Sequence, residues 1–190
     1  MPLSAALQAA APTCWIAIVA SAAVALGAGC GGDRCGPEDG EIARVLDGDT
    51  VVLRSGETVR YALIDTPETG DAPECYAVEA REANRALVAG RPLRLSYDVE
   101  CEDRYGRLLA YVSVDGREVN RTLVERGFAC VLHIPPNGAD AWARFEELQA
   151  AAKESHRGLW GVCTADMPCT ARVRLRATGI APAAELPYER

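Results

Sequence analysis

The sequence has few of the residues that usually bind transition metals. It contains only two histidines, His133 and His156, and no pair of cysteines with Cys-x-x-Cys spacing. Structural zinc is held mainly by cysteine and histidine at short, fixed spacings, and neither histidine stands in such a pattern. The sequence therefore argues against a zinc site.

An excess of positive charge is also missing. The chain has 20 lysine and arginine residues against 27 aspartate and glutamate residues, a net charge of -7. Nonspecific affinity for nucleic acid comes mainly from counterion release by lysine and arginine, so broad electrostatic docking is not expected. Any phosphate chemistry must rest on a few local arginines or on a metal ion. With 49% hydrophobic and 25% charged residues in 190, we expect one globular domain with tails.

The first 32 residues contain no charged side chain. Their apolar run, Cys14 to Gly32, is typical of an export signal and its cleavage zone, although the usual basic start is missing. A wrongly assigned start codon or a membrane anchor would explain that gap, and the run is marginal in length for a spanning helix. Cys30 follows Leu-Gly-Ala-Gly and resembles the lipidated cysteine of bacterial lipoproteins, except that Gly27 replaces an aliphatic residue. We expect an exported chain, lipid-anchored in the cell envelope through Cys30 or otherwise secreted.

Four segments follow from the composition. Residues 1–29 are the expected export signal, 30–40 a flexible Gly-rich acidic tether, 41–163 the folded domain and 164–190 an irregular C-terminal tail. Alternating apolar residues and Asp-Gly or Ser-Gly turns predict five short strands, and apolar residues at helical spacing predict three helices. The predicted fold is α+β, mainly β: a five-stranded OB-like Greek-key barrel with three helices. The strands are expected at 41–46, 50–54, 57–64, 92–99 and 107–114, and the helices at 76–90, 118–127 and 140–160.

Charged residues are concentrated in three short stretches of the predicted domain. "VLDGDTVVL" reads as a hairpin in which Asp47-Gly48 makes the turn, so that Asp49 is a second acid that the turn does not need. "RYALIDTPET" (60–69) combines an arginine, two acids and a Thr-Pro step, and "DRYGRLLAYV" (103–112) combines a turn with two arginines. Each stretch alone is also what an ordinary charged turn would contain.

Together and in this order, these stretches strongly resemble the thermonuclease family, the staphylococcal-nuclease-like phosphodiesterases. The resemblance covers roughly residues 41–160 and includes "VNRTLVERGFA" and the terminal "GLW". It implies a five-stranded OB barrel, dependence on Ca2+, and hydrolysis of DNA and RNA to products that carry a 3′-phosphate. It also implies roles for six residues: metal ligation by Asp49, Asp65 and the Thr66 carbonyl, phosphate binding by Arg60 and Arg107, and activation of the attacking water by Glu68.

The chemistry of these side chains agrees with those roles. Carboxylate and carbonyl oxygens are ligands that suit Ca2+, and planar guanidinium groups can bind a phosphate through two parallel hydrogen bonds. One geometric condition follows. Arg60 and Asp65 are five residues apart, so a regular strand would point them to opposite faces of the sheet. Their cooperation therefore requires a bend or bulge near Ala62 to Ile64.

The sequence departs from the family's best-known branch at His133, which stands where a tyrosine stacks on the nucleotide base. His133 either stacks on a base or is a hydrogen-bonded residue at a strand end, and His156 is expected to be solvated. Arg104 and Tyr105 either touch the substrate or are exposed turn residues. We expect a monomer that prefers single-stranded or frayed DNA and RNA. The alternatives are a binding module for nucleic acid or protein, and a lipid-tethered, calcium-dependent scaffold.

Eight cysteines are present, and six remain after Cys14 and Cys30 are assigned to the signal and the lipid. An even set in an exported chain predicts disulfides, with fifteen possible pairings. If Glu68 and Arg107 converge on one phosphate, their loops lie side by side. This convergence and the docking of the last helix lead us to expect the pairs Cys75–Cys101, Cys130–Cys163 and, by elimination, Cys35–Cys169.

Overall fold

A computed structural model describes residues 35–163 of the chain. Five strands form a barrel in the order β3-β2-β1-β5-β6, and parallel pairing of β3 with β6 closes it. The remaining neighbours in the barrel are antiparallel. The predicted mainly β, OB-like barrel is confirmed. Its strands are β1 (Asp39–Val45), β2 (Thr50–Leu53), β3 (Thr58–Tyr61), β5 (Pro92–Glu102) and β6 (Leu108–Val114).

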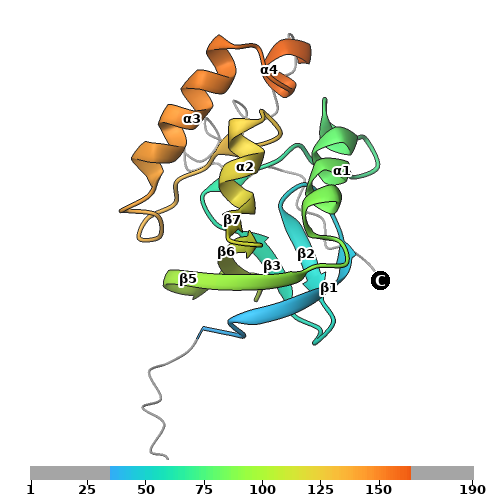
Figure 1. Cartoon of the computed structure of the whole chain (residues 1–190), viewed down its shortest axis with the longest axis vertical. Helices are drawn as coiled ribbons and strands as arrows, with labels where there is room; N and C mark the ends of the chain where they lie inside the picture. Colours follow the sequence, from blue (N-terminus) through green and yellow to red (C-terminus); the bar gives the residue numbers. More distant parts are fainter. Residues whose placement is uncertain (1–34, 164–190) are drawn as a thin grey trace, which may run out of the picture. The chain divides into compact units, whose positions relative to one another are not determined.

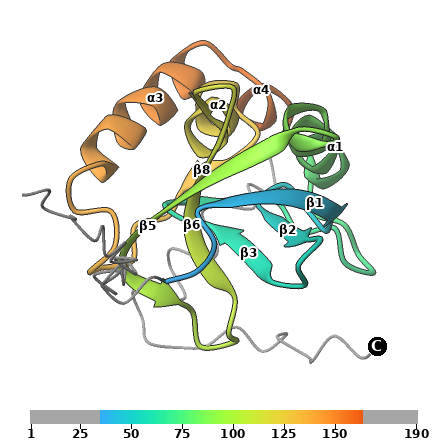
Figure 2. The same ribbon diagram turned by 60° about the horizontal axis from the view of Figure 1, so that its bottom comes forward.

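The helices gather on one side of the strands, and α2 lies between α1 and α3 (Figure 1). Figure 2 brings the strands forward and shows β1, β2 and β3 following one another beside β5. The region predicted as a third helix is divided: α3 ends at Glu154, Gly158 adopts a positive φ of 55°, and a single-turn helix follows. The helices are α1 (Ala77–Val88), α2 (Val119–Glu125), α3 (Trp142–Glu154) and α4 (Leu159–Val162).

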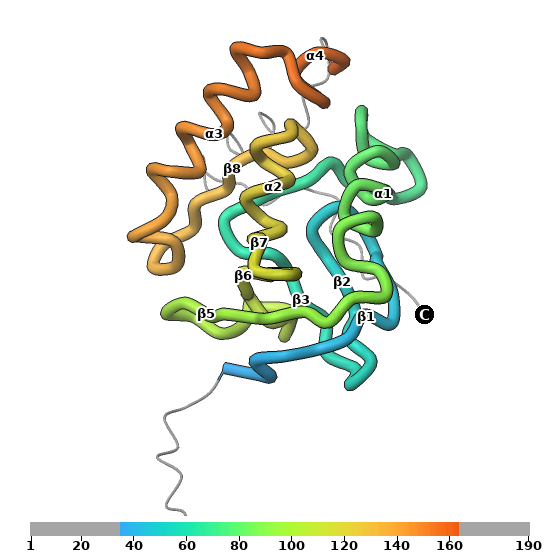
Figure 3. Tube along the Cα trace, in the orientation of Figure 1, coloured from blue at the N-terminus to red at the C-terminus, as the bar shows by residue number. Residues whose placement is uncertain are grey.

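Three two-residue strands connect these elements. Strand β4 (Ile64–Asp65) pairs antiparallel with β8 (Cys130–Val131), and β8 runs beside α3 (Figure 3). Strand β7 (Arg117–Glu118) forms a hairpin with β6. The β4–β8 ladder fixes the residues after β3 against the segment that follows α2.

The core follows from the alternation in the sequence. Along β6, Leu108, Ala110, Val112 and Val114 are buried and the residues between them are half-buried. Successive side chains of a strand point to opposite faces, so this pattern fills the barrel interior from one side. Phe145 of α3 joins the same hydrophobic core. Within residues 35–163, no helix has the length and apolar composition needed to cross a membrane.

The N-terminal boundary of the domain differs from the prediction. Residues 35–40 were expected to belong to a flexible tether, but β1 already begins at Asp39. Before it, the Tyr97 hydroxyl donates a hydrogen bond to the Pro37 carbonyl at 2.7 Å, and the Leu95 N–H donates to the Glu38 carbonyl at 2.7 Å. The segment therefore runs along β5. The expected signal, the lipidation site Cys30 and the tail from 164 lie outside the described residues.

The three expected disulfide pairs are wrong. Cys35 is bonded to Cys101, and Cys75 is bonded to Cys163. The pairs Cys75–Cys101, Cys130–Cys163 and Cys35–Cys169 are thereby excluded, although Cys130 is disulfide-bonded as well. The reason lies in the path of the chain: residues 35–38 follow β5 to Cys101. At the other end, Cys75 packs in a small apolar cluster with Cys130, Leu159 and Cys163, which brings the start of α1 to the end of α4.

Candidate functional site

The turn between β1 and β2 directs the Asp49 side chain into the protein. The Asp47 carboxylate accepts a hydrogen bond from the Asp49 N–H at 3.1 Å, which is the side-chain turn that aspartate favours. Asp49 is buried, and its Oδ2 accepts the Thr66 N–H at 2.7 Å, while its Oδ1 accepts the Thr50 hydroxyl at 3.0 Å. Asp47 thus forms the turn, and Asp49 reaches across to the segment after β4.

The chain bends between Arg60 and Asp65, which was the predicted condition for both side chains to act at one site. Strand β3 ends at Tyr61, a turn follows at Ala62 and Leu63, and β4 begins at Ile64. Leu63 has a φ of 64°, in the left-handed region that a leucine rarely adopts. The bend brings Arg60 Nη2 to 2.8 Å from Asp65 Oδ1, so the predicted bend is confirmed.

Arg60 lies between the two acids. Its Nη1 is 3.0 Å from Asp49 Oδ2 and also donates to the carbonyls of Tyr61 and Ile64, at 3.0 and 2.8 Å. Burial alone would lower the pKa of Arg60, but the charges of Asp49 and Asp65 outweigh this effect and raise the pKa above its ordinary value. The repulsion expected between two close carboxylates is therefore relieved by a fixed guanidinium of the chain itself.

Asp47 and Glu68 extend this acidic cluster. Burial, followed by the charges of Asp49 and Glu68, raises the pKa of Asp47 to about 8. Glu68 is exposed and directly follows the buried Pro67. The structure thus brings Asp49, Asp65 and Arg60 into direct contact and places Glu68 within electrostatic reach of Arg60.

Arg107 is held separately, by an acid of its own loop. Its Nε and Nη2 lie 2.7 and 2.6 Å from Asp103 Oδ2, and Asp103 Oδ1 also accepts the backbone N–H groups of Tyr105 and Arg107. The parallel register of β3 and β6 pairs Arg60 with Leu109. Because alternate residues share a face, Arg107, two positions earlier, belongs to the same side of the sheet as Arg60.

The turn before β6 also presents an aromatic ring. The guanidinium carbons of Arg104 and Arg107 lie 4.8 and 5.5 Å from the centroid of the Tyr105 ring, which is largely exposed. Both distances allow a cation–π attraction. Arg104 and Tyr105 therefore form one surface with Arg107, and whether that surface binds substrate stays a prediction.

His133 follows the β4–β8 ladder and stacks on Trp142, with ring centroids 5.3 Å apart and planes 5° from parallel. Its Nε2 is buried and has no hydrogen-bond partner among the described residues. Trp142 covers one face of the imidazole while 42% of its own surface stays exposed. The helical spacing of Trp142, Phe145, Leu148 and Ala152 in the sequence predicts that all four face the core, but Trp142 lies at the surface against His133.

Asn84 also belongs to the site, although it was not predicted from the sequence. It is fully buried on α1, donates to the Asp47 carbonyl at 3.1 Å and accepts the Tyr61 hydroxyl at 3.0 Å. It thereby ties the acidic turn to the end of β3. A signal was present: Asn84 occupies the same buried stripe of α1 as Ala77, Ala80 and Val88, where a polar residue needs a partner.

The donor set fits a hard cation. Two buried carboxylates, Asp49 and Asp65, already converge on one positive group, and the backbone of Thr66 adjoins both. Within residues 35–163 there is no group of three or more histidine, cysteine or acidic side chains arranged to hold a metal. A cation here would therefore be held by two carboxylates, the Thr66 carbonyl and water, which is a set that Ca2+ accepts.

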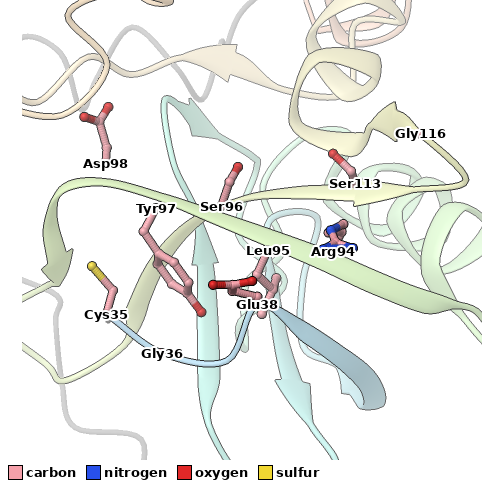
Figure 4. A pocket seen from close by; sticks show the side chains of 10 residues that line it. All are labelled: Cys35, Gly36, Glu38, Arg94, Leu95, Ser96, Tyr97, Asp98, Ser113 and Gly116. Atoms are coloured by element: carbon pink, nitrogen blue, oxygen red, sulfur yellow. The ribbon is translucent and has the colours of Figure 1, made fainter. Parts of the chain in front are cut away.

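A separate hollow of about 710 Å³ lies along β5 and the N-terminal segment. Figure 4 shows Glu38 and Tyr97 among its lining residues, with Arg94 and Ser96 on the same strand as Tyr97. Neither the acidic cluster nor the arginines Arg60, Arg104 and Arg107 line it. The candidate site is therefore the acidic cluster and not this hollow.

Comparisons with known proteins agree with this geometry. The family described as "Staphylococcal nuclease homologue" matches residues 58–162, more than half of the chain, and the chain belongs to this family. Endonuclease YncB of Bacillus subtilis (strain 168) is 39% identical over 124 residues, which cover 62% of this chain and 59% of that protein. The SPbeta prophage-derived endonuclease YokF of the same organism is 39% identical over 129 residues, covering 64% and 44%.

The thermonuclease of Staphylococcus hyicus is 32% identical over 126 residues, which cover 63% of this chain and 74% of that protein. The chain spans about half the length of the two Bacillus endonucleases. The similarity therefore concerns the nuclease-like domain.

Proposed function

We propose that this protein is a Ca2+-dependent phosphodiesterase that hydrolyses DNA and RNA to products with a 3′-phosphate. The observation that carries the proposal is the convergence of Asp49 and Asp65 on Arg60 in a buried site, where the guanidinium nitrogens lie 3.0 and 2.8 Å from the two carboxylates. A binding module gains nothing from two buried acids beside a phosphate site, because acids repel phosphate. The names of the similar proteins, two endonucleases and a thermonuclease, support the same activity.

Phosphodiester hydrolysis requires neutralised charge on the phosphate oxygens and a water positioned in line with the leaving group. Bound between Asp49, Asp65 and the Thr66 carbonyl, Ca2+ would supply positive charge to the phosphate. Arg60 and Arg107 would add guanidinium charge from the same side of the sheet, each oriented in advance by an acid. Preorganised donors of this kind stabilise the transition state without having to move during the reaction.

Glu68 would orient the attacking water or accept its proton. Glu68 is accessible to solvent, and its charge acts on Asp47 of the acidic cluster. Asp47 is less suited to this role, because its carboxylate already accepts the Asp49 N–H and forms the turn. Arg104, Tyr105 and His133 with Trp142 would contact neighbouring parts of the nucleic acid.

Substrate form, location and oligomeric state complete the proposal. Single-stranded or frayed nucleic acid fits best, because the net charge of -7 disfavours tight binding along a duplex. Export fits the disulfides Cys35–Cys101 and Cys75–Cys163, because disulfides persist mainly in oxidising compartments. We further propose a monomer that is attached to the cell envelope through a lipid on Cys30.

The test is degradation of single-stranded DNA and RNA by the purified protein, with Ca2+ and with a chelator, followed by analysis of the product ends. We expect cleavage of both polymers only with Ca2+, and 3′-phosphate ends. Binding of DNA without cleavage would support the binding module instead. Calcium binding with neither DNA binding nor cleavage would support the scaffold.

A further inference from the structure

The loop that carries Glu68 is closed by a reciprocal pair of hydrogen bonds. It runs from Glu68 to Glu74 between β4 and α1 and contains neither helix nor strand. The Glu68 N–H donates to Glu74 Oε2 at 2.8 Å, and the Glu74 N–H donates to the Glu68 carbonyl at 3.0 Å. One of these bonds needs the Glu74 side chain, and the other needs only the backbone.

Both ends of this loop are anchored to the rest of the protein. Before Glu68, the Thr66 N–H is bonded to the Asp49 carboxylate. After Glu74, Cys75 is fixed to the end of α4 by its disulfide with Cys163. The loop is therefore fixed before Glu68 by the Asp49 carboxylate and after Glu74 by the disulfide. The Glu74 side chain joins these two fixed ends by its hydrogen bond to Glu68.

We propose that Glu74 is a positioning residue for Glu68, through the hydrogen bond that its carboxylate accepts from the Glu68 N–H. This inference rests on the proposed function, in which Glu68 acts on the attacking water. Glu68 is exposed, so packing alone does not fix its backbone. A misplacement of about 1 Å in a reacting group can lower a rate by roughly 100-fold. We therefore expect the rate to fall measurably when the Glu68 backbone is no longer held in this orientation.

The experiment compares kcat, KM and calcium affinity for Glu74→Ala, Glu74→Gln and a matched control, Asp71→Ala. Asp71 is an exposed acid of the same loop that takes no part in the closing pair. We expect Glu74→Ala to lower kcat by about 10- to 100-fold with KM and calcium affinity unchanged. Glu74→Gln should restore most of the rate, because its amide oxygen still accepts the N–H. Asp71→Ala should behave like the wild type.

A double-mutant cycle with Glu68→Gln decides whether Glu74 acts through Glu68. We expect Glu68→Gln alone to be slow and Glu74→Ala to add no further loss to it. If Glu74→Ala lowers the rate by the same factor in the wild type and in Glu68→Gln, the inference is overturned. It is also overturned if Glu74→Gln is as slow as Glu74→Ala, because the charge of Glu74 would then be what matters.

The outcomes separate the inference from the proposed function. A wild-type protein without nuclease activity contradicts the proposed function itself. A slow Glu68→Gln variant beside a fully active Glu74→Ala variant contradicts the inference alone. A fully active Glu68→Gln variant removes the role of Glu68 and overturns the inference with it. If a loss of calcium affinity or of thermal stability accounts for the slower rate of Glu74→Ala, the role of Glu74 is structural. That result would also overturn the inference.

Discussion

Arg60 and Asp49 form an ion pair of 3.0 Å in which the side chains are only 12% and 5% exposed. The pair connects the acidic turn after β1 to the end of β3. Water screens such a pair weakly, and removal of one partner leaves a buried charge without compensation. The site is therefore held in shape by the chain's own charges, and its residues contribute to stability as well as to chemistry.

Substitution of Arg60 by lysine is expected to be costly although the charge is kept. A single ammonium group cannot reach both acids and the carbonyls of Tyr61 and Ile64 as the guanidinium does. We expect kcat/KM to fall by at least about 100-fold, in line with roughly 3 kcal/mol for an electrostatic transition-state contact, and stability in urea to fall too. Arg94→Lys, at an exposed ion pair with Asp39, is the control. Wild-type rates for Arg60→Lys would contradict the assignment.

Arg107→Lys should lower kcat/KM by a similar factor but leave stability nearly unchanged. The Arg107 side chain is about one-third exposed and paired with Asp103, and exposed pairs are worth about 0–1 kcal/mol. Lysine cannot present two parallel N–H groups to a phosphate. Rates and urea unfolding curves for the two arginine variants check the difference. A large loss of stability with an unchanged rate would place Arg107 outside the phosphate site.

The raised pKa of Asp47 predicts a pH-dependent stability in protein freed of metal by a chelator. A carboxyl that titrates near pH 8 in the fold and near 3.8 when unfolded favours the folded state in its protonated form. That contribution is fully present below pH 3.8 and is lost as pH rises through about 8. The wild type should therefore lose stability relative to Asp47→Asn across this window. Parallel stability curves for the two proteins would contradict the assignment.

We expect the disulfides to contribute much of the free energy of unfolding. Cys75 and Cys163 are 88 residues apart, and a loop of this length corresponds to about 4–5 kcal/mol in the chain-entropy model. The double variant Cys75→Ser, Cys163→Ser should lose stability of that order in chemical denaturation. Peptide mapping without reduction should recover Cys35–Cys101 and Cys75–Cys163 as linked peptides. A Cys75–Cys101 peptide would contradict the structure.

The barrel was predictable because the strands alternate regularly and their turns carry glycine. The bend before Asp65 was predictable because two residues five apart cannot share a face of a regular strand. The Cys35–Cys101 disulfide was not, because the path of residues 35–38 along β5 rests on hydrogen bonds to the Pro37 and Glu38 carbonyls that leave no periodic signal in the sequence.

The contacts inside the site were only partly predictable. The resemblance to the thermonuclease family implied a shared cation between Asp49 and Asp65, and the structure shows that Arg60 itself lies between them. The position of Asn84 could have been recognised, because it is a polar residue on the apolar stripe of a helix. The stacking of His133 on Trp142 left none, because it joins residues of separate elements through a tertiary contact.

The calcium dependence of DNA cleavage by the wild type and by Asp65→Asn is the most direct test of a catalytic calcium site at Asp49 and Asp65. Asp65 is buried, contacts Arg60 at 2.8 Å and is proposed as a metal ligand, while the asparagine keeps its shape but loses its charge. A titration of cleavage rate against Ca2+ concentration compares the two proteins, with calorimetry to measure binding. We expect saturable activation of the wild type, and for Asp65→Asn a much weaker calcium affinity and a rate at least about 100-fold lower. Equal rates and equal calcium affinities for the two proteins, or full activity of the wild type in chelator, would contradict a catalytic calcium site at Asp65.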